Sequence, residues 1–213
     1  MDNASSRRPI ASRNAGWAKR TASYLAKRNV TPNFISLISI AFASISLIAF
    51  YLDTTTDHYH LLWMSLAVAG IQGRLIMNLL DGMVAVEHHK KSIVGGLYNE
   101  VPDRVADALT IFGVGLEIQH MTYGMDLAYV AIILATATAY IRTLGASLGC
   151  PHFFLGPMAK QHRMAFITFA CVVAIWYQPV FYYVLIIMNV GLLITCYRRL
   201  STISRHLKKG SAI

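Results

Sequence analysis

The sequence predicts an all-α integral membrane protein with six transmembrane helices and an N-terminal amphipathic interfacial helix. Of its 213 residues 55% are apolar and only 14% are charged, and the mean hydropathy is +0.48. A soluble domain of this length carries more charge. Several apolar runs also reach the roughly 20 residues that a helix needs to cross a bilayer. The three cysteines are widely spaced, which excludes a disulfide framework.

The predicted spans are residues 33–52, 61–80, 101–116 and 127–141, followed by two spans within residues 164–197. The last stretch has no charge and would be about 50 Å long as one helix at about 1.5 Å per residue, too long for a single crossing. Gln178-Pro179 is the natural place for it to turn. Thr31 is a candidate N-cap of the first span, with Pro32 as the first helical residue.

These spans divide the chain into three parts. Residues 1–32 form a basic tail with the interfacial helix, residues 33–197 form the membrane domain, and residues 198–213 form a basic cytoplasmic tail.

The basic residues indicate how the spans are oriented. The chain has 19 Lys and Arg against 10 Asp and Glu, a formal net charge of +9. No Lys or Arg lies in residues 53–60, in residues 117–126 or in the Gln178-Pro179 turn. Cytoplasmic loops retain Lys and Arg, so both termini are expected in the cytoplasm. The surplus charge therefore reflects topology, and no nucleic-acid partner is expected.

Residues 15–28 predict the interfacial helix. A helix here places Trp17, Tyr24 and Leu25 on one face and Lys19 opposite them. Such a helix lies on a surface of anionic lipids. The alternative is a disordered basic tail that only sets the topology.

Polar residues gather at the cytoplasmic ends of the second and third predicted spans. Asn78 and Asp81 are three residues apart, and Asn99, Asp103 and Asp107 follow at intervals of four, so each group shares one helical face. Carboxylate and amide oxygens suit Mg²⁺ or Mn²⁺, which also bind substrate phosphates. The pattern predicts a divalent-metal site on the cytoplasmic side, and the alternative is a polar packing contact between two helices.

This region resembles the CDP-alcohol phosphatidyltransferases. Their signature reads Asp-x2-Asp-Gly-x2-Ala-Arg, about eight residues, then Gly-x3-Asp-x3-Asp. The matching positions here are Asn78, Asp81, Gly82, Ala85, Val86, Gly95, Asn99 and Asp103. The register fits without a gap and departs from the signature at Asn78, Val86 and Asn99. The basic Thr-Pro-Asn entry into the first span, within residues 25–33, is also similar to the family's.

The resemblance implies an enzyme of phospholipid synthesis that transfers a phosphatidyl group from CDP-diacylglycerol to a small polar alcohol and releases CMP. It implies Mg²⁺ or Mn²⁺ as cofactor, an active site on the cytoplasmic face, a bacterial inner membrane and a homodimer. The family's roles would make Asp103 the general base, place the metal on Asn78, Asp81, Asn99 and Asp103, and line a cytidine pocket with Gly82, Ala85 and Gly95. Glu100 and Asp107 lie close enough in sequence to restore the charge missing at the two asparagines. The alternatives are a degenerate relative that binds lipid or nucleotide without turnover, and a small-solute transporter.

Four basic residues are candidates for binding the phosphate of an acceptor or a lipid: Arg74, Arg142, Lys160 and Arg163. The simpler interpretation of the last three is that loop cations set the topology. Arg74 lies inside a predicted span, four residues before Asn78, and would contact a phosphate or pair with Asp81 or Asp107.

Overall fold

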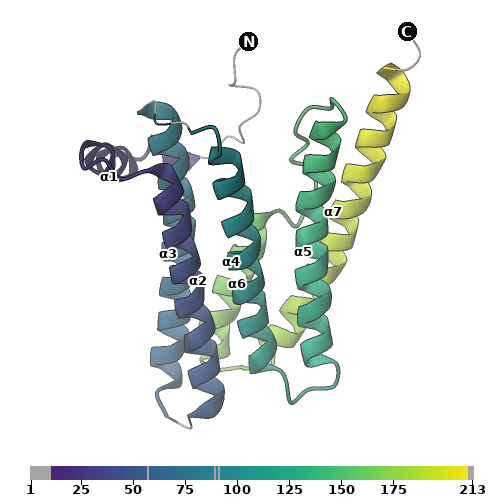
Figure 1. Ribbon diagram of the computed structural model, residues 1–213. Coiled ribbons are helices and arrows are strands. Elements are labelled where there is room, and N and C mark those ends of the chain that lie inside the picture. The colour runs from purple at the N-terminus through teal and green to yellow at the C-terminus, as the bar shows by residue number, and fades with distance from the viewer. Residues whose placement is uncertain (1–10, 57, 89, 91, 211–213) are drawn as a thin grey trace. The chain divides into compact units, whose positions relative to one another are not determined.

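The computed structural model describes residues 11–56, 58–88, 90 and 92–210. These residues are helical and contain no strand (Figure 1). They form two compact units, one ending at Glu117 and the other beginning at Ile118. The elements are the short 3-10 helix η1 (Ala11–Asn14) and the α-helices α1 (Gly16–Lys27), α2 (Pro32–Thr55), α3 (His60–Glu87), α4 (Gly95–Glu117), α5 (Gly124–Ser147), α6 (Lys160–Ala174) and α7 (Val180–Gly210).

Four helices are long and apolar enough to cross a membrane, which identifies an integral membrane protein. They are Pro32–Thr55, His60–Glu87, Gly124–Ser147 and Val180–Lys209. The other two predicted spans do not meet these criteria, so the six-span topology is not confirmed. One of them lies in α4, whose N-terminal half is rich in charged residues, and the other is α6, which has only 15 residues.

In the first unit, α2 packs along both α3 and α4. The approach to α3 is close at Gly70, where a Cβ atom would lie 2.7 Å from the main-chain oxygen of Phe42 and 2.8 Å from the nitrogen of Ser46. The approach to α4 is close at Gly113, where a Cβ atom would lie 2.5 Å from the Phe50 ring. Glycine at these two positions lets the helix backbones come together.

The start of α2 confirms the predicted cap. The Thr31 hydroxyl accepts a hydrogen bond from the Phe34 main-chain nitrogen at 3.3 Å, and Pro32 is the first helical residue. Proline is favoured there because its missing N–H would have no partner in the first turn.

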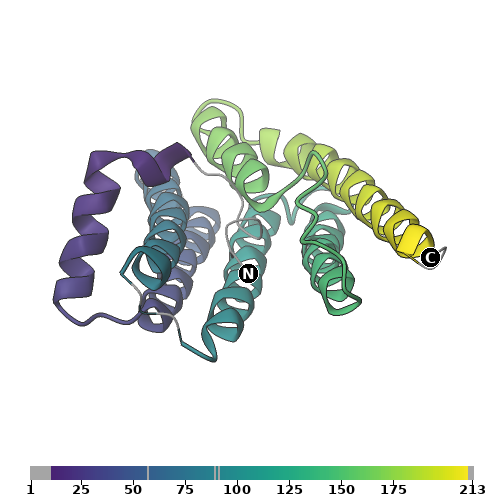
Figure 2. The same cartoon turned by 90° about the horizontal axis from the view of Figure 1, so that it is seen from above.

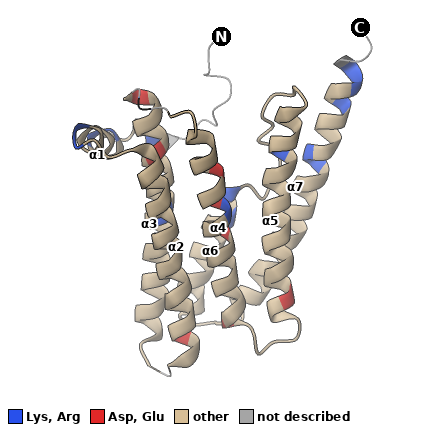
Figure 3. Ribbon diagram, viewed as in Figure 1, with Lys and Arg blue, Asp and Glu red and all other residues tan. Residues whose placement is uncertain are grey.

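The predicted N-terminal helix is present as α1, but it packs through a different face from the aromatic one. Ala18, Ala22 and Ala26 are buried against α3, whereas Trp17 and Tyr24 are about half exposed. Small side chains allow the helix to approach α3 closely and leave the aromatic rings on the outer side. In the view from above, α1 is seen from the side, whereas α2, α3 and α4 are seen nearly end-on, so α1 runs across the direction of these helices (Figure 2). Basic residues mark α1, and acidic residues mark α4 (Figure 3).

The end of α1 is tied to the segment between α3 and α4. Asn29, just after α1, adopts a left-handed conformation (φ 56°), and a residue in this conformation commonly ends a helix. The Lys90 ammonium donates to the main-chain oxygen of Ala26 at 2.6 Å and to Oδ1 of Asn29 at 3.1 Å. A cation at this position also interacts favourably with the C-terminal end of the helix dipole.

In the second unit, α7 packs against both α5 and α6. The predicted turn at Gln178-Pro179 is confirmed, since α6 ends at Ala174 and α7 begins at Val180. α7 extends through residues 198–210, so the described part of the expected basic tail is helical. Residues 33–197 contribute to both compact units, with the boundary between Glu117 and Ile118. The single membrane domain over these residues stays a prediction.

Candidate functional site

Asp81 lies in α3 and faces α2. Its side chain is buried, and its Oδ2 accepts a hydrogen bond from the Ser36 hydroxyl at 2.5 Å. One turn earlier in α3, the amide nitrogen of Asn78 is buried and has no hydrogen-bond partner among the described residues. The assignment of nitrogen and oxygen in an amide is exchangeable, so the Asn78 side chain can turn to present its oxygen at that position. α3 therefore offers one oriented carboxylate and one amide oxygen.

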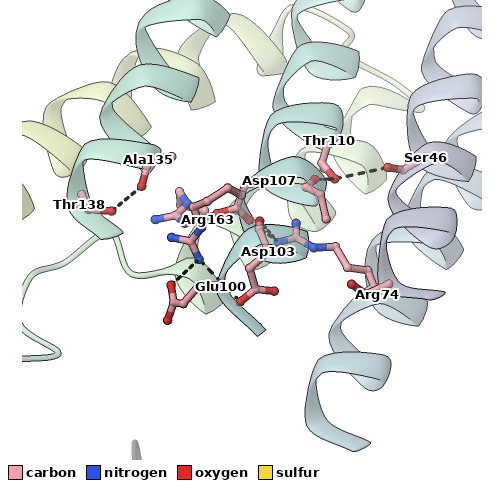
Figure 4. A network of polar contacts seen from close by, with 12 residues as sticks. Ser46, Arg74, Glu100, Asp103, Asp107, Thr110, Ala135, Thr138 and Arg163 are labelled. Atoms are coloured by element: carbon pink, nitrogen blue, oxygen red, sulfur yellow. Dashed lines mark hydrogen bonds and ion pairs between the residues drawn. The ribbon is translucent and has the colours of Figure 1, made fainter. Parts of the chain in front are cut away.

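Arg74 joins α3 to α4 deeper in the unit. Its side chain is fully buried and forms an ion pair with the Asp107 carboxylate (Figure 4). The same Nη2 atom lies 3.4 Å from the main-chain oxygen of Asp103. Of the three possibilities that the sequence left open for Arg74, the structure shows the pair with Asp107. A guanidinium with no exposed surface is poorly placed to bind a lipid or acceptor phosphate.

The Arg74 contact brings the two polar helix faces to one depth. Because α3 and α4 run in opposite directions, the turn after Arg74, which carries Asn78, lies level with the turn before Asp107, which carries Asp103. The four-residue intervals keep each set on one face of its helix. The sequence pattern thus predicts which residues share a level in the first unit.

The outer turns of α4 are polar and partly exposed. Arg104 Nη2 lies 3.6 Å from a carboxylate oxygen of Asp103 and 3.9 Å from one of Glu100. Asn99 is exposed. Pro102 lies inside α4 and has no N–H, so the helix lacks one main-chain hydrogen bond in the turn that precedes Asp103.

Hydroxyl groups of α2 complete a polar seam that the sequence analysis missed. Ser36 contacts Asp81, and Ser46 lies 3.5 Å from the Thr110 hydroxyl of α4 (Figure 4). Both serines are buried. Ser36, Ser39 and Ser46 are spaced so that they lie on one face of α2. This polar face of an otherwise apolar helix is the sequence pattern from which the seam could have been predicted.

The predicted metal ligands are carboxylate and amide oxygens, which are the donor types that suit a hard cation. Among the described residues, no group of three or more His, Cys, Asp and Glu side chains is arranged to hold a metal. The charge of Asp107 is offset by Arg74. Asp81 on α3 and Asp103 and Glu100 on α4 remain candidate carboxylate ligands. Mg²⁺ is commonly bound by one or two carboxylates together with substrate phosphates.

The residues expected to line a nucleotide pocket are small and partly buried. Gly82 and Ala85 lie on α3 just beyond Asp81, with Val86 next to them, and Gly95 begins α4. Side chains of this size leave room for a ligand to approach the helix backbone.

Three of the candidate phosphate-binding residues lie in the second unit. Arg142 stacks over the Phe154 ring with 5.4 Å between the guanidinium carbon and the ring centre. Arg163 is buried and donates to the main-chain oxygen of Met158 at 3.0 Å. Lys160 begins α6 and is partly buried. Arg142 and Arg163 therefore each contact the segment between α5 and α6.

Arg199 belongs with these residues, although the sequence analysis did not single it out. Its side chain is buried and donates to the main-chain oxygens of Leu155 and Thr138. It lies within α7, in the basic stretch that was expected to be a tail.

No protein-family model and no curated protein matches the sequence. Solved structures do match. A crystal structure of Mycobacterium tuberculosis phosphatidylinositol phosphate synthase (PgsA1) with CDP-DAG bound is 16% identical, has a TM-score of 0.74, and covers 89% of this chain and 94% of its own. The structure of the same synthase in complex with manganese and citrate is 16% identical, with a TM-score of 0.71 and coverage of 87% and 88%. The apo form is 17% identical, with a TM-score of 0.69 and coverage of 86% and 94%. Over nearly its whole length, the chain therefore has the fold of this phosphatidylinositol phosphate synthase.

Proposed function

We propose that this protein is a CDP-alcohol phosphatidyltransferase, which transfers a phosphatidyl group from CDP-diacylglycerol to a small polar alcohol and releases CMP. The observation that carries the proposal is the gapless register of the signature from Asn78 to Asp103, laid out on α3 and α4 of a chain with the PgsA1 fold. One of the PgsA1 structures has CDP-DAG bound.

One divalent cation, Mg²⁺ or Mn²⁺, would be held by Asp81 and Asp103 with the amide oxygens of Asn78 and Asn99. Glu100 is the nearest further carboxylate on α4, and its charge is shared with Arg104. When bound, such a cation neutralises the charge of a diphosphate and orients it. Two carboxylates neutralise one divalent cation, whereas a second cation would leave the site with excess positive charge. The two cations would then repel each other. A PgsA1 structure contains manganese.

Asp103 would act as the general base. The acceptor hydroxyl passes its proton to the Asp103 carboxylate while its oxygen bonds to the β-phosphorus, and the bond from that phosphorus to the CMP oxygen breaks. A partly exposed carboxylate suits this role, because it must reach a substrate and later return the proton to solvent. Gly82, Ala85 and Gly95 would leave space for the cytidine.

Arg142 and Lys160 would bind a phosphate of the acceptor or of a lipid on the cytoplasmic side. Arg163 was a candidate for the same role, but it is buried like Arg74 and donates to the main-chain oxygen of Met158, so it would support the segment before α6 instead. The exposed Trp17 and Tyr24 of α1, beside its basic residues, would rest on anionic lipids, and both termini would be cytoplasmic. We propose a homodimer. The small-residue run 135–139 of α5 was its candidate contact, but Ala135, Thr138 and Ala139 are buried within the protomer, so this run would serve internal helix packing.

A second function is favoured by the substitutions at Asn78, Val86 and Asn99. Each removes a charge from the family signature, so a relative that binds CDP-diacylglycerol without turnover is the alternative. A transporter is disfavoured because the polar residues gather near the ends of α3 and α4, whereas transporters place such groups near the membrane midplane.

The test is CMP release by the purified protein. CDP-diacylglycerol is supplied in mixed micelles with Mg²⁺ or Mn²⁺, and the acceptors are glycerol 3-phosphate, inositol, inositol phosphate, serine and simple alcohols. We expect release with at least one acceptor and none from the Asp81→Ala variant. Asp126→Ala, which removes an exposed aspartate at the start of α5, is the matched control and should retain activity.

Two outcomes would overturn the proposal. Full activity in Asp81→Ala would remove the assigned site. An absence of CMP release with every acceptor, together with retained binding of CDP-diacylglycerol, would favour the non-catalytic alternative.

A further inference from the structure

We propose that Arg74 is a positioning residue that holds the turn of α4 carrying Asp103 against α3. The inference rests on the proposed function, because it concerns the placement of the proposed base. It assigns to Arg74 a role different from binding a substrate phosphate.

Both contacts of Arg74 that carry the inference are to one turn of α4. The guanidinium pairs with the Asp107 carboxylate, and its Nη2 lies 3.4 Å from the main-chain oxygen of Asp103. These two residues are four apart, so Arg74 spans one turn of the partner helix. Both contacts are made by Nη2, whose two N–H groups lie in the rigid guanidinium plane and point in fixed directions, whereas the three N–H groups of an ammonium rotate freely.

This link matters because little else joins the two helices directly. α3 and α4 each pack along α2 and contact one another only sparsely. The two halves of the proposed site, with Asp81 on α3 and Asp103 on α4, are therefore tied directly through Arg74.

The turn before Asp103 has a particular need for an outside restraint. Pro102 cannot donate a main-chain hydrogen bond, so α4 has one bond fewer there. Arg104 adds little, because its 3.6 Å separation from the Asp103 carboxylate exceeds hydrogen-bond length and its side chain is 24% exposed.

The experiment compares Arg74→Met, Asp107→Asn and the double variant in the CMP-release assay, at a temperature where each is shown to be folded. We expect each single variant to lower kcat about 100-fold, the loss that follows when a catalytic group is displaced by about 1 Å, with little change in the KM for CDP-diacylglycerol. The double variant should be no worse than either single one, because the two residues act as a unit. Arg104→Met, which removes a cation of the same kind beside Asp103, should cost much less.

Arg74→Lys separates positioning from stability and serves if Arg74→Met does not fold. It keeps the charge beside Asp107 but loses the planar fork, so thermal stability should recover more than kcat. A raised KM for CDP-diacylglycerol at normal kcat, with additive effects of the two substitutions, would mean that Arg74 binds substrate. A normal kcat in folded Arg74→Met would mean that the Arg74–Asp107 ion pair supports the fold and does not position Asp103. Either result overturns the positioning role alone, whereas an inactive wild-type protein overturns the proposed function as well.

Discussion

The Ser36→Ala substitution tests how α2 supports the candidate site. Ser36 is 4% exposed and donates to Oδ2 of Asp81, which is 3% exposed, over 2.5 Å. A hydrogen bond to a charged group contributes about 1.5–3 kcal/mol, and its loss inside a helix bundle is not repaid by water. At about 1.4 kcal/mol for each factor of ten, removing the hydroxyl is expected to weaken whatever depends on the orientation of Asp81 by roughly 10- to 100-fold.

The assay is CMP release as a function of Mn²⁺ concentration, together with thermal unfolding in detergent. The half-saturating Mn²⁺ concentration should rise by roughly 10- to 100-fold in Ser36→Ala. Ser39→Ala is the matched control, because Ser39 is equally buried on α2 but donates only to the main-chain oxygen of Ser36 within its own helix. It should leave the Mn²⁺ dependence unchanged.

This reasoning would be refuted if Ser36→Ala had the same Mn²⁺ dependence and the same unfolding midpoint as the wild-type protein. A change in stability alone, with the metal dependence unaltered, would show that the Ser36 bond supports packing and not the metal site.

Gly70→Ala should lower the free energy of unfolding by about 1–3 kcal/mol, because the new methyl group meets the backbone of α2; Gly96→Ala, which meets nothing within 4 Å, should leave it unchanged or raise it. Denaturant titration of both variants checks the difference, and equal stabilities would contradict the close packing of α2 and α3. Lys90→Met should accelerate amide hydrogen exchange at the end of α1 by roughly tenfold or more, because the ammonium bond to the Ala26 carbonyl is lost. Unchanged exchange there would show that the alanine face alone holds α1.

The predictions that succeeded rest on local chemistry. The start of α2 follows from Thr31 and Pro32, and the break before α7 follows from Gln178-Pro179, because caps and prolines act within one helical turn. The helix over Gly16–Lys27 was also predictable, although its packing face was not. The aromatic face was expected to meet lipid, and Trp17 and Tyr24 are about half exposed, whereas Ala18, Ala22 and Ala26 make the contact with α3.

The partners of the site residues depend on residues far apart in the chain. Ser36 and Asp81 are 45 positions apart, and Arg74 and Asp107 are 33 apart. The spacing of Asn78, Asp81, Asn99 and Asp103 placed them on helix faces, but only the docking of α3 and α4 against α2 selects which groups meet.

By itself, the sequence determined that this protein is helical, that apolar helices carry it into a membrane, and which polar residues share a helix face. These properties follow from composition and from the 3.6-residue period of the helix. Only the tertiary structure decided that Arg74 pairs with Asp107 and that the Ser36 hydroxyl donates to Asp81. The physical reason is that a buried charge is stable only beside its partner, and the partner is chosen by how the helices pack.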